Sequence, residues 1–541
     1  MSIEESHVTE TTPPRLMPEE LARLAHLVAV GSPYRLVGDT LYVQYRDADF
    51  VDLFHAEGKS GISPVDLAFV TVFQFLENLS DRQAAHAVRV RVDWKYALHL
   101  PLDYAGFDFS VLSEFRARVI RHGAEGRLFE AVLMQLAALG LVKRRGRQRT
   151  DSLAVLSKMR DLNRLEMVVE TLRMALQAML KAKVAWTQAT VPTTWEEVYG
   201  DRCITGKMTQ AERQGMADRV GPDGQWLLER LQAEIAPPVL RTLPAVELLV
   251  TVWQQQFEMV EGRVVFRDKD DADGHTRIYT PHDPEARYSK KGQQRWVGDK
   301  LQVTETDDEG QPHLITDIAI TSSVETDYEA LNSIQGRLED RGLLPAQQYA
   351  DSGYVTEANL VHSTGRKIDL VGPVQKDTSR QARMPGGITL DQFDVDAEAC
   401  IATCPAGQQA TVGTQRAKRL VFRFPKGVCA ACPLRPQCCT GKGGRTLSLG
   451  RHYHILQAAR ARQQTEAFKI DYHQHRSGVE GCLSAMVRGQ GVRVARYNER
   501  SKRNLHALFT AAGVNLRRAA LWRAGQRPQV RRQGLGLVPA T

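Results

Sequence analysis

The sequence predicts an α/β protein preceded by an all-α N-terminal domain, and three observations support this fold class. Apolar residues recur at spacings of three and four in the first part of the chain, which is the period of amphipathic helices. Beyond residue 143, short β-compatible runs alternate with helical stretches, an order typical of a sheet with helices on its faces. Two long stretches interrupt this alternation, one helical and one rich in cysteine.

The N-terminal helical domain is expected over residues 18–142, after a disordered stretch over residues 1–17. Pro64–Leu79 and Ser110–His122 both have helical apolar spacing. Ser80 is a plausible cap for a further helix that begins at Asp81. This domain has no obvious catalytic cluster, so a role in binding or oligomerisation is expected.

The α/β domain is expected over residues 143–525, with a first strand at about Arg147–Leu156. A helical insertion over residues 160–260 separates that strand from its partners, and a C-terminal helical segment begins at about Ile455. The remaining strands and helices alternate, each set off by Gly, Asp or Pro. The expected strands are Arg263–Arg267, Trp296–Glu305, His313–Ser322, Gln347–Ala350 and Lys367–Val374, and the expected helices between them are Asp327–Arg341 and Thr356–Ser363.

The formal charge of +8 is unevenly distributed. Thr411–Thr541 contains 25 Lys and Arg and 4 Asp and Glu, a charge of +21, which leaves −13 for the preceding 410 residues. A split of this size suggests a polyanionic partner for the C-terminal part, and a solvated basic tail is the alternative. Residues 526–541 are expected to form a basic, flexible tail.

The first residues are acidic and polar, unlike a signal peptide. An uninterrupted apolar stretch of about 18 residues, which a membrane span needs, does not occur in the sequence. A cytoplasmic protein without a membrane partner is therefore expected.

Two aspartates lie where α/β folds place functional groups. Asp151 belongs to the first strand and Asp351 closes a later one. Carboxylates on neighbouring strands can hold two Mg²⁺ ions about 4 Å apart, and magnesium prefers such hard oxygen ligands. The alternatives are structural, because Asp151 could cap a turn and Asp351 could belong to an ordinary loop.

A third carboxylate, Glu480, lies in a segment of helical spacing. Arg476, Glu480, Ser484 and Arg488 recur every four residues, so they share one helix face. That face offers a metal-binding carboxylate between two phosphate-binding guanidiniums. The alternative is structural, since Ser477-x-x-Glu480 also fits a capping box and Arg476 with Glu480 an ordinary helix ion pair.

The segment 395–445 holds six of the eight cysteines, and Cys203 and Cys482 are expected to be small buried hydrophobes. In a cytosolic protein, paired cysteines at such intervals favour a tetrahedral structural Zn²⁺ over disulfides. An iron–sulfur cluster or a redox-sensitive thiol patch is the competing interpretation. The expected ligands are Cys404, Cys429, Cys432 and Cys438, with Cys400, Cys439, His452 and His454 as alternates.

Several segments together resemble DDE transposases of bacterial insertion sequences, over roughly Leu36 to Trp522. The branch they resemble has a helical N-terminal domain, a long insertion after the first catalytic strand and a cysteine-bearing segment before the last carboxylate. The segments that carry the resemblance are Phe73–Leu100, Gly146–Glu166, Gln348–Ser363, Cys432–Cys438 and Arg476–Tyr497.

The resemblance implies a ribonuclease H-like catalytic domain, whose first strand, fourth strand and a late helix supply an acidic triad. Asp151, Asp351 and Glu480 match those positions and would hold two Mg²⁺ or Mn²⁺ ions. Tyr472 and Arg488 match less well, because the tyrosine spacing is one residue longer than the commoner pattern and an arginine replaces a lysine. The implied activity is DNA cleavage at insertion-sequence ends and strand transfer into target DNA, by a homodimer associated with the nucleoid.

Basic residues flank the proposed site and are expected to contact DNA phosphates, which provide affinity but little sequence information. Two other functions remain open. One is a ribonuclease H-like nuclease without strand transfer, and the other is a catalytically inactive, zinc-containing DNA-binding protein descended from a transposase. The expected DNA contacts are Arg145, Arg147, Arg149, Tyr472, Arg476, Arg488, Arg493 and Arg496.

Overall fold

The computed structural model describes residues 6–7, 15–54, 59–158, 163–267, 276–377, 379–396, 399–416, 419–439, 441 and 443–526. The expected disordered N-terminus and the expected basic tail lie outside these residues, apart from 6–7, 15–17 and 526. In the described part of the chain, no helix is both long and apolar enough to span a membrane.

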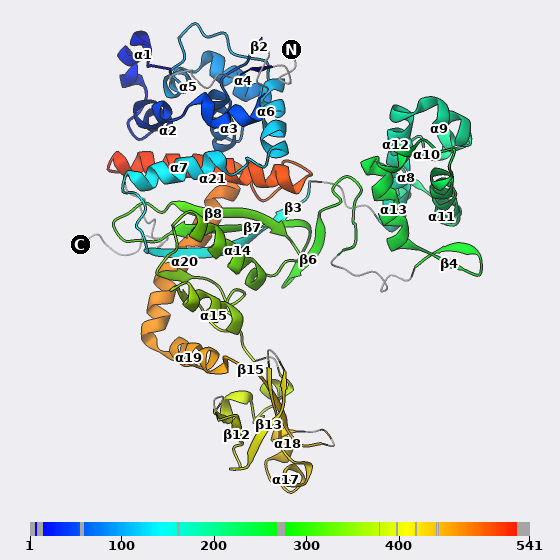
Figure 1. Cartoon of the computed structure of the whole chain (residues 1–541), viewed down its shortest axis with the longest axis vertical. Coiled ribbons are helices and arrows are strands. Elements are labelled where there is room, and N and C mark those ends of the chain that lie inside the picture. The colour runs from blue at the N-terminus through cyan, green and yellow to red at the C-terminus, as the bar shows by residue number, and fades with distance from the viewer. Residues whose placement is uncertain are drawn as a thin grey trace, which may run out of the picture.

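A mixed six-stranded sheet forms the middle of the molecule (Figure 1). Its order is β10–β9–β3–β7–β6, and β8 also pairs with β7. β9 runs parallel to β3 and to β10, whereas β7 runs antiparallel to β3, β6 and β8. The strands are β3 (Arg147–Leu156), β6 (Arg287–Lys291), β7 (Gln294–Thr306), β8 (Ile315–Ser322), β9 (Gln347–Tyr349) and β10 (Asp369–Val371).

This architecture agrees with the α/β prediction, and β3 covers the predicted residues from end to end. β10 is shorter than predicted and ends before Gly372, whose position leaves no room for a side chain because a Cβ would lie 2.4 Å from the Ala350 carbonyl oxygen. β6 was not predicted, because its five residues are mostly polar and show no apolar alternation.

Helices cover both faces of the central strands. Thr150 and Asp151 show this, because neighbouring residues of a strand point to opposite faces. On one face, Thr150 of β3 bonds Gln348, whose side chain accepts a hydrogen bond from Gln335 of α14. On the other face, Asp151 pairs with Arg476 of α20. The helices that accompany the sheet are α14 (Asp327–Asp340), α15 (Glu357–Gly365), α19 (Tyr453–Gln464), α20 (Glu466–Gln490) and α21 (Arg500–Arg523).

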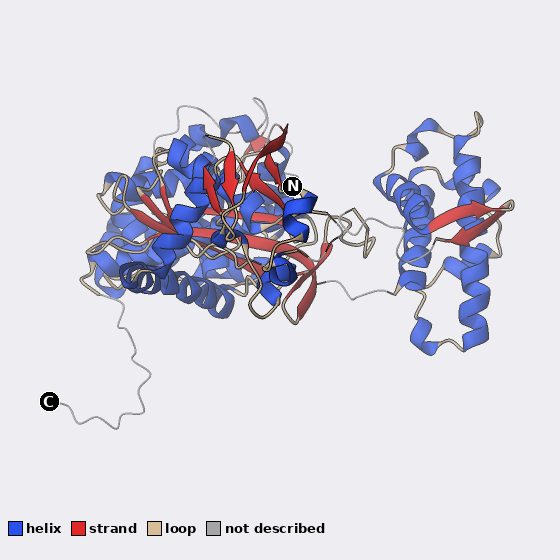
Figure 2. Cartoon of the chain, turned by 90° about the horizontal axis from the view of Figure 1, so that it is seen from below, coloured by secondary structure: helices blue, strands red, loops and turns tan. Residues whose placement is uncertain are grey.

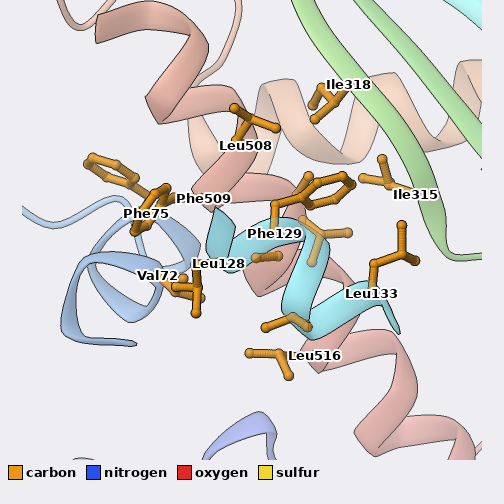
Figure 3. Close-up of a cluster of buried hydrophobic side chains, with 14 of the residues drawn as sticks. Val72, Phe75, Leu128, Phe129, Leu133, Ile315, Ile318, Leu508, Phe509 and Leu516 are labelled. Atoms are coloured by element: carbon orange, nitrogen blue, oxygen red, sulfur yellow. The ribbon is translucent and has the colours of Figure 1, made fainter. Parts of the chain in front are cut away.

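The N-terminal helices and the sheet share one hydrophobic core. α21 and α7 lie between them in Figure 1. Figure 3 shows the contact: side chains of α7 and α21 lie between α3 and the residues Ile315 and Ile318 of β8. Packing is therefore continuous across residue 142, where the domain boundary was expected. The N-terminal helices are α1 (Glu19–Arg23), α2 (Pro33–Leu36), α3 (Pro64–Leu76), α4 (Asp81–Val90), α5 (Val92–Ala97), α6 (Ser110–Arg121) and α7 (Arg127–Ala138).

The helical insertion has its own core and lies to one side of the sheet in Figure 2. Its helices surround Trp195, Leu227 and Trp253, all buried. The elements are α8 (Arg164–Ala182), α9 (Val184–Thr190), α10 (Trp195–Tyr199), α11 (Gln210–Gln232), α12 (Pro238–Arg241), α13 (Pro244–Gln256), β4 (Phe257–Val260) and β5 (Arg263–Phe266).

The cysteine-rich segment also has a separate core, built around a five-stranded antiparallel sheet that the sequence did not predict. Phe422 and Ala402 are fully buried in it. The elements are α16 (Arg380–Arg383), β11 (Asp394–Asp396), β12 (Ile401–Thr403), β13 (Gln409–Arg416), β14 (Arg419–Arg423), α17 (Lys426–Ala430), α18 (Arg435–Cys438) and β15 (Thr446–Gly450).

Candidate active site

The register of two parallel strands brings Asp151 and Asp351 together. Arg149 of β3 lies opposite Tyr349 of β9, and each aspartate follows two residues later in the same direction. Asp151 and Asp351 therefore lie in neighbouring chain segments, on the same side of the sheet. Their charges interact, because the carboxylate of Asp351 contributes to raising the pKa of Asp151.

Asp151 is the more enclosed of the two carboxylates, with 11 % of its side chain exposed. Burial raises its pKa, and Arg476 opposes that rise through an ion pair in which Nη2 lies 2.8 Å from Oδ2. Arg476 belongs to α20 and is itself buried. The positive charge of Arg476 thus compensates the carboxylate of Asp151.

Asp351 is half-buried and accepts a 2.7 Å hydrogen bond from the backbone N–H of Gly353. The glycine matters here, since a Cβ at position 353 would lie 2.9 Å from Asp351 Oδ1. Lys291, at the end of β6, places its Nζ 4.0 Å from Asp351 Oδ2. A second basic side chain therefore faces the carboxylate pair.

Glu480 lies one helical turn beyond Arg476 on α20, with its Oε1 3.6 Å from Arg476 Nη1. Its side chain is 71 % exposed, so it borders the site rather than closing it. Tyr472 lies one turn before Arg476, and burial raises the pKa of its hydroxyl, with smaller contributions from both aspartates. α20 thus presents these three side chains beside the two aspartates.

In the described part of the chain, no three His, Cys, Asp or Glu side chains are close enough together to hold one metal ion. At the active site this agrees with the outward position of Glu480. Asp151 and Asp351 form the inner pair of carboxylates. Arg488 lies two turns beyond Glu480, is exposed, and bonds Ser484 Oγ at 2.7 Å.

Arg149 has a different environment from the one expected of a DNA contact. It is buried between Glu305 and Asp307, with N–O distances of 2.7 and 2.6 Å. It also donates to the backbone carbonyl of His475 in α20, at 3.2 Å. Gly478 packs against its guanidinium, where a Cβ would come within 2.0 Å of Nη1. Because these groups enclose Arg149, we assign it to positioning α20 and leave it out of the proposed DNA contacts.

The other basic residues expected to contact DNA lie around this core. Arg145 is exposed and donates to backbone carbonyls in the turn before β10. Arg147 is half-buried and lies 3.1 Å from Nε2 of His475. Arg493 is half-buried, and its carbonyl accepts the N–H of Leu156 at the end of β3. Arg496 is half-buried and donates to a carbonyl in the loop after α3, so it joins the N-terminal helices to the C-terminal part.

The cysteine-rich segment brings its four expected ligands to one small cavity of about 30 Å³. Its lining includes Cys404, Cys429, Cys432 and Cys438, with Cys439 beside them. The N–H of Gln408 donates to Cys404 Sγ and that of Arg445 to Cys429 Sγ, both at 3.4 Å. Burial raises the pKa of the Cys438 thiol, and the neighbouring thiols act in the same direction.

Two known family models match the chain. A transposase DDE domain matches residues 403–520, which include five of the six clustered cysteines, α20 with Glu480, and most of α21. A second transposase domain, DUF772, matches residues 22–118 in the N-terminal helices. Together the two matches support an insertion-sequence DDE transposase. No curated protein matches it, and no solved structure does.

The match to transposase domains implies a DNA substrate. It also relates the two ends of the chain, since one matched region covers the N-terminal helices and the other includes most of α21. These parts pack together in one core with the sheet that carries Asp151. The fold thus joins both matched regions to β3, the strand that carries Asp151.

Proposed function

We propose that this transposase cleaves DNA at the ends of an insertion sequence and joins the 3′-hydroxyls to target DNA, with Asp151, Asp351 and Glu480 as its acidic triad. The observation that most supports the proposal is the juxtaposition of Asp151, on β3, and Asp351, two residues beyond the end of the parallel strand β9. Arg476 pairs with Asp151 and borders Glu480, and the charge of Asp351 contributes to raising its pKa.

We assign the sheet and its flanking helices to a ribonuclease H-like domain. The assignment is supported by the order and direction of the strands. On one side of β3, β7 is antiparallel to β3 and β8 is antiparallel to β7, and on the other side β9 is parallel to β3 and β10 is parallel to β9. The first carboxylate then lies on the first strand, the second follows a later parallel strand, and the third lies on a late helix.

The residues at this site fit two Mg²⁺ or Mn²⁺ ions by their chemistry, since carboxylate oxygens are the ligands that these cations prefer. When bound, such ions activate the attacking oxygen of water or of a 3′-hydroxyl and stabilise the leaving oxygen. Asp151 and Asp351 would hold them from the sheet, and Glu480 would approach from the exposed face of α20. Arg476, once released from Asp151, is placed to bind a phosphate oxygen of the substrate.

The proposal is tested with a labelled duplex that carries one end of the element encoding this chain. In Mg²⁺ the native protein is expected to nick the duplex at the element boundary and to join the new 3′-hydroxyl to target DNA. Glu480→Gln should still bind the duplex but lose both reactions, because the exposed side chain can change without disturbing the core. Gln474→Glu, an exposed change on the same helix, serves as the control.

Binding without nicking by the native protein would contradict the proposal and favour a catalytically inactive DNA-binding protein. Nicking without strand transfer would favour a nuclease. We expect the active form to be a homodimer on DNA, because two element ends must be brought together, and we expect it to associate with the nucleoid.

We also propose that the cysteine-rich segment binds one structural Zn²⁺. Four thiols line one cavity, and two of them accept backbone N–H bonds, which stabilise thiolates. The thiols must move closer and lose their protons to coordinate an ion, because their present positions do not form a metal-binding group. His452 and His454 do not line this cavity.

Purified native protein is expected to contain about one zinc ion per chain, as a four-cysteine structural site requires. Cys429→Ser and Cys438→Ser should each lose the zinc and lower the melting temperature. Cys203→Ser, in the separate core of the helical insertion, should retain it. Zinc content by atomic emission checks these outcomes, and zinc-free native protein with an intact fold would contradict the proposal.

A further inference from the structure

The hairpin formed by β6 and the start of β7 extends beyond the body of the sheet. β6 is an edge strand that pairs only with residues 294–298 of β7, whereas β3 and β8 pair with the rest of that strand (Figure 1). A two-residue turn joins the strands, and Gly292 supplies the positive φ, 60°, that such a turn needs. The hairpin is anchored at its base by Trp296, which is buried.

The tip of this hairpin is strongly basic. Residues 286–298 contain four Lys and Arg and no Asp or Glu. Lys290 and Arg295 lie directly opposite each other, and both are exposed. Like charges in that position destabilise a strand pair. Within the described residues neither of them forms an ion pair, so in that part of the chain no carboxylate compensates this repulsion.

One known role of a lysine on an edge strand is simply to prevent aggregation. That role does not require a second cation on the opposite strand, nor a lysine that faces a carboxylate pair. Lys291 is 63 % exposed, yet its Nζ lies 4.0 Å from Asp351 Oδ2. At the base of the hairpin, Tyr288 is partly exposed and stacks on Tyr279, with ring centroids 5.9 Å apart. Cations beside exposed aromatic rings are typical of nucleic-acid-binding surfaces.

We propose that the tip of the β6–β7 hairpin binds the phosphate backbone of the DNA strand that enters the carboxylate site. Lys290 and Arg295 bind successive phosphates, which relieves their mutual repulsion. Lys291, on the side of the carboxylates, is a positioning residue that holds the phosphate next to the one being cleaved. The inference rests on the proposed function, because it assumes that DNA reaches Asp151 and Asp351.

The test compares a Lys290→Gln/Arg295→Gln double variant with a Lys181→Gln/Lys183→Gln control. The control removes the same charge from exposed positions in the helical insertion. Binding to a mixed-sequence duplex is measured without divalent metal over a range of salt concentrations, since phosphate contacts carry no sequence information. Each lost contact lowers the slope of log K against log salt by about 0.9, so the hairpin variant should lose about 1.8 and bind about tenfold more weakly at low salt.

The melting temperature of the hairpin variant should be unchanged or higher, because it loses a repulsive pair. A slope equal to that of the native protein would overturn the hairpin proposal while leaving the proposed function intact. Native protein that binds no DNA would overturn the proposed function, and the hairpin proposal with it.

Lys291→Gln is expected to cleave more slowly per bound duplex. Cleavage at the native rate would remove Lys291 from the proposal.

Discussion

Replacing Asp351 with asparagine is expected to abolish DNA cleavage, with a rate lower by about 10³-fold or more. The reason is the loss of a metal-binding oxygen pair, which supplies several kcal/mol of charge stabilisation in metal-dependent phosphoryl transfer. Asp151→Asn should have an effect of the same size. Asparagine has nearly the shape of aspartate, so DNA binding should persist in both variants, and it is measured beside cleavage of the labelled element end.

Asp351→Asn should also fold normally, because Asp351 is half-buried and its charge repels that of Asp151. Asp151→Asn removes the charge that pairs with buried Arg476, so it should also lower the stability of the protein. Asp369→Asn is the matched control, because Asp369 forms a largely exposed ion pair with Arg462 at the other edge of the sheet. Such surface pairs contribute little to stability. Asp369→Asn should cleave at the native rate, and cleavage that survives in Asp351→Asn would remove Asp351 from the site.

Strand ends, helix spacing and a family resemblance predict Asp151, Asp351 and Glu480 as the acidic triad, and this role stays a prediction. The fold brings Asp151 and Glu480 to Arg476, and Asp351 follows the strand beside Asp151. The register of β3 against β9 explains this proximity. The pairing of two strands determines which of their residues become neighbours. In both segments the aspartate lies two residues after a paired residue, Arg149 in one and Tyr349 in the other.

The role of Lys291 was not predictable from local patterns. It depends on β6, whose residues have no apolar alternation, and on an edge position that only the pairing with β7 defines. The only signal in the sequence was the pair of adjacent lysines, Lys290 and Lys291, directly before Gly292. The shared core across residue 142 was also hidden, because it depends on α21, which packs against α3 and α7 from the far end of the sequence.

Arg149 shows the opposite limitation, since its neighbourhood in the sequence is basic but its environment in the fold is acidic. The run from Lys143 to Arg149 suggested one phosphate-binding surface. Arg147 and Arg149 point to the same face of β3, because they lie two residues apart, yet only Arg149 is enclosed. Arg147, at the start of the strand, is half-buried, whereas Arg149 lies between Glu305 and Asp307. A run of like charges therefore does not predict which of its members contact solvent.

Arg149→Ala is accordingly expected to lower the free energy of unfolding by about 3 kcal/mol or more, because it removes the partner of two buried carboxylates. Burial would raise the pKa of Glu305, but Arg518 and Arg149 together hold it below its usual range. The stabilisation from this group is present above pH 4.5, the ordinary value, and is lost as the pH falls through the lower pKa of the folded state. The variant should therefore lose less stability between neutral and acidic pH than the native protein.

The same change should also disable cleavage, because Arg149 bonds the His475 carbonyl and packs against Gly478, two residues before Glu480. Arg147→Ala is the control, with an expected loss of about 1 kcal/mol or less, since its side chain is partly solvated. Denaturant unfolding separates the two interpretations of Arg149. A DNA contact would leave unfolding unchanged and reduce only the salt dependence of binding, whereas a positioning role lowers stability in the absence of DNA. Because one buried guanidinium joins β3 and β7 to the helix that carries the third carboxylate, folding and assembly of the active site should be lost together.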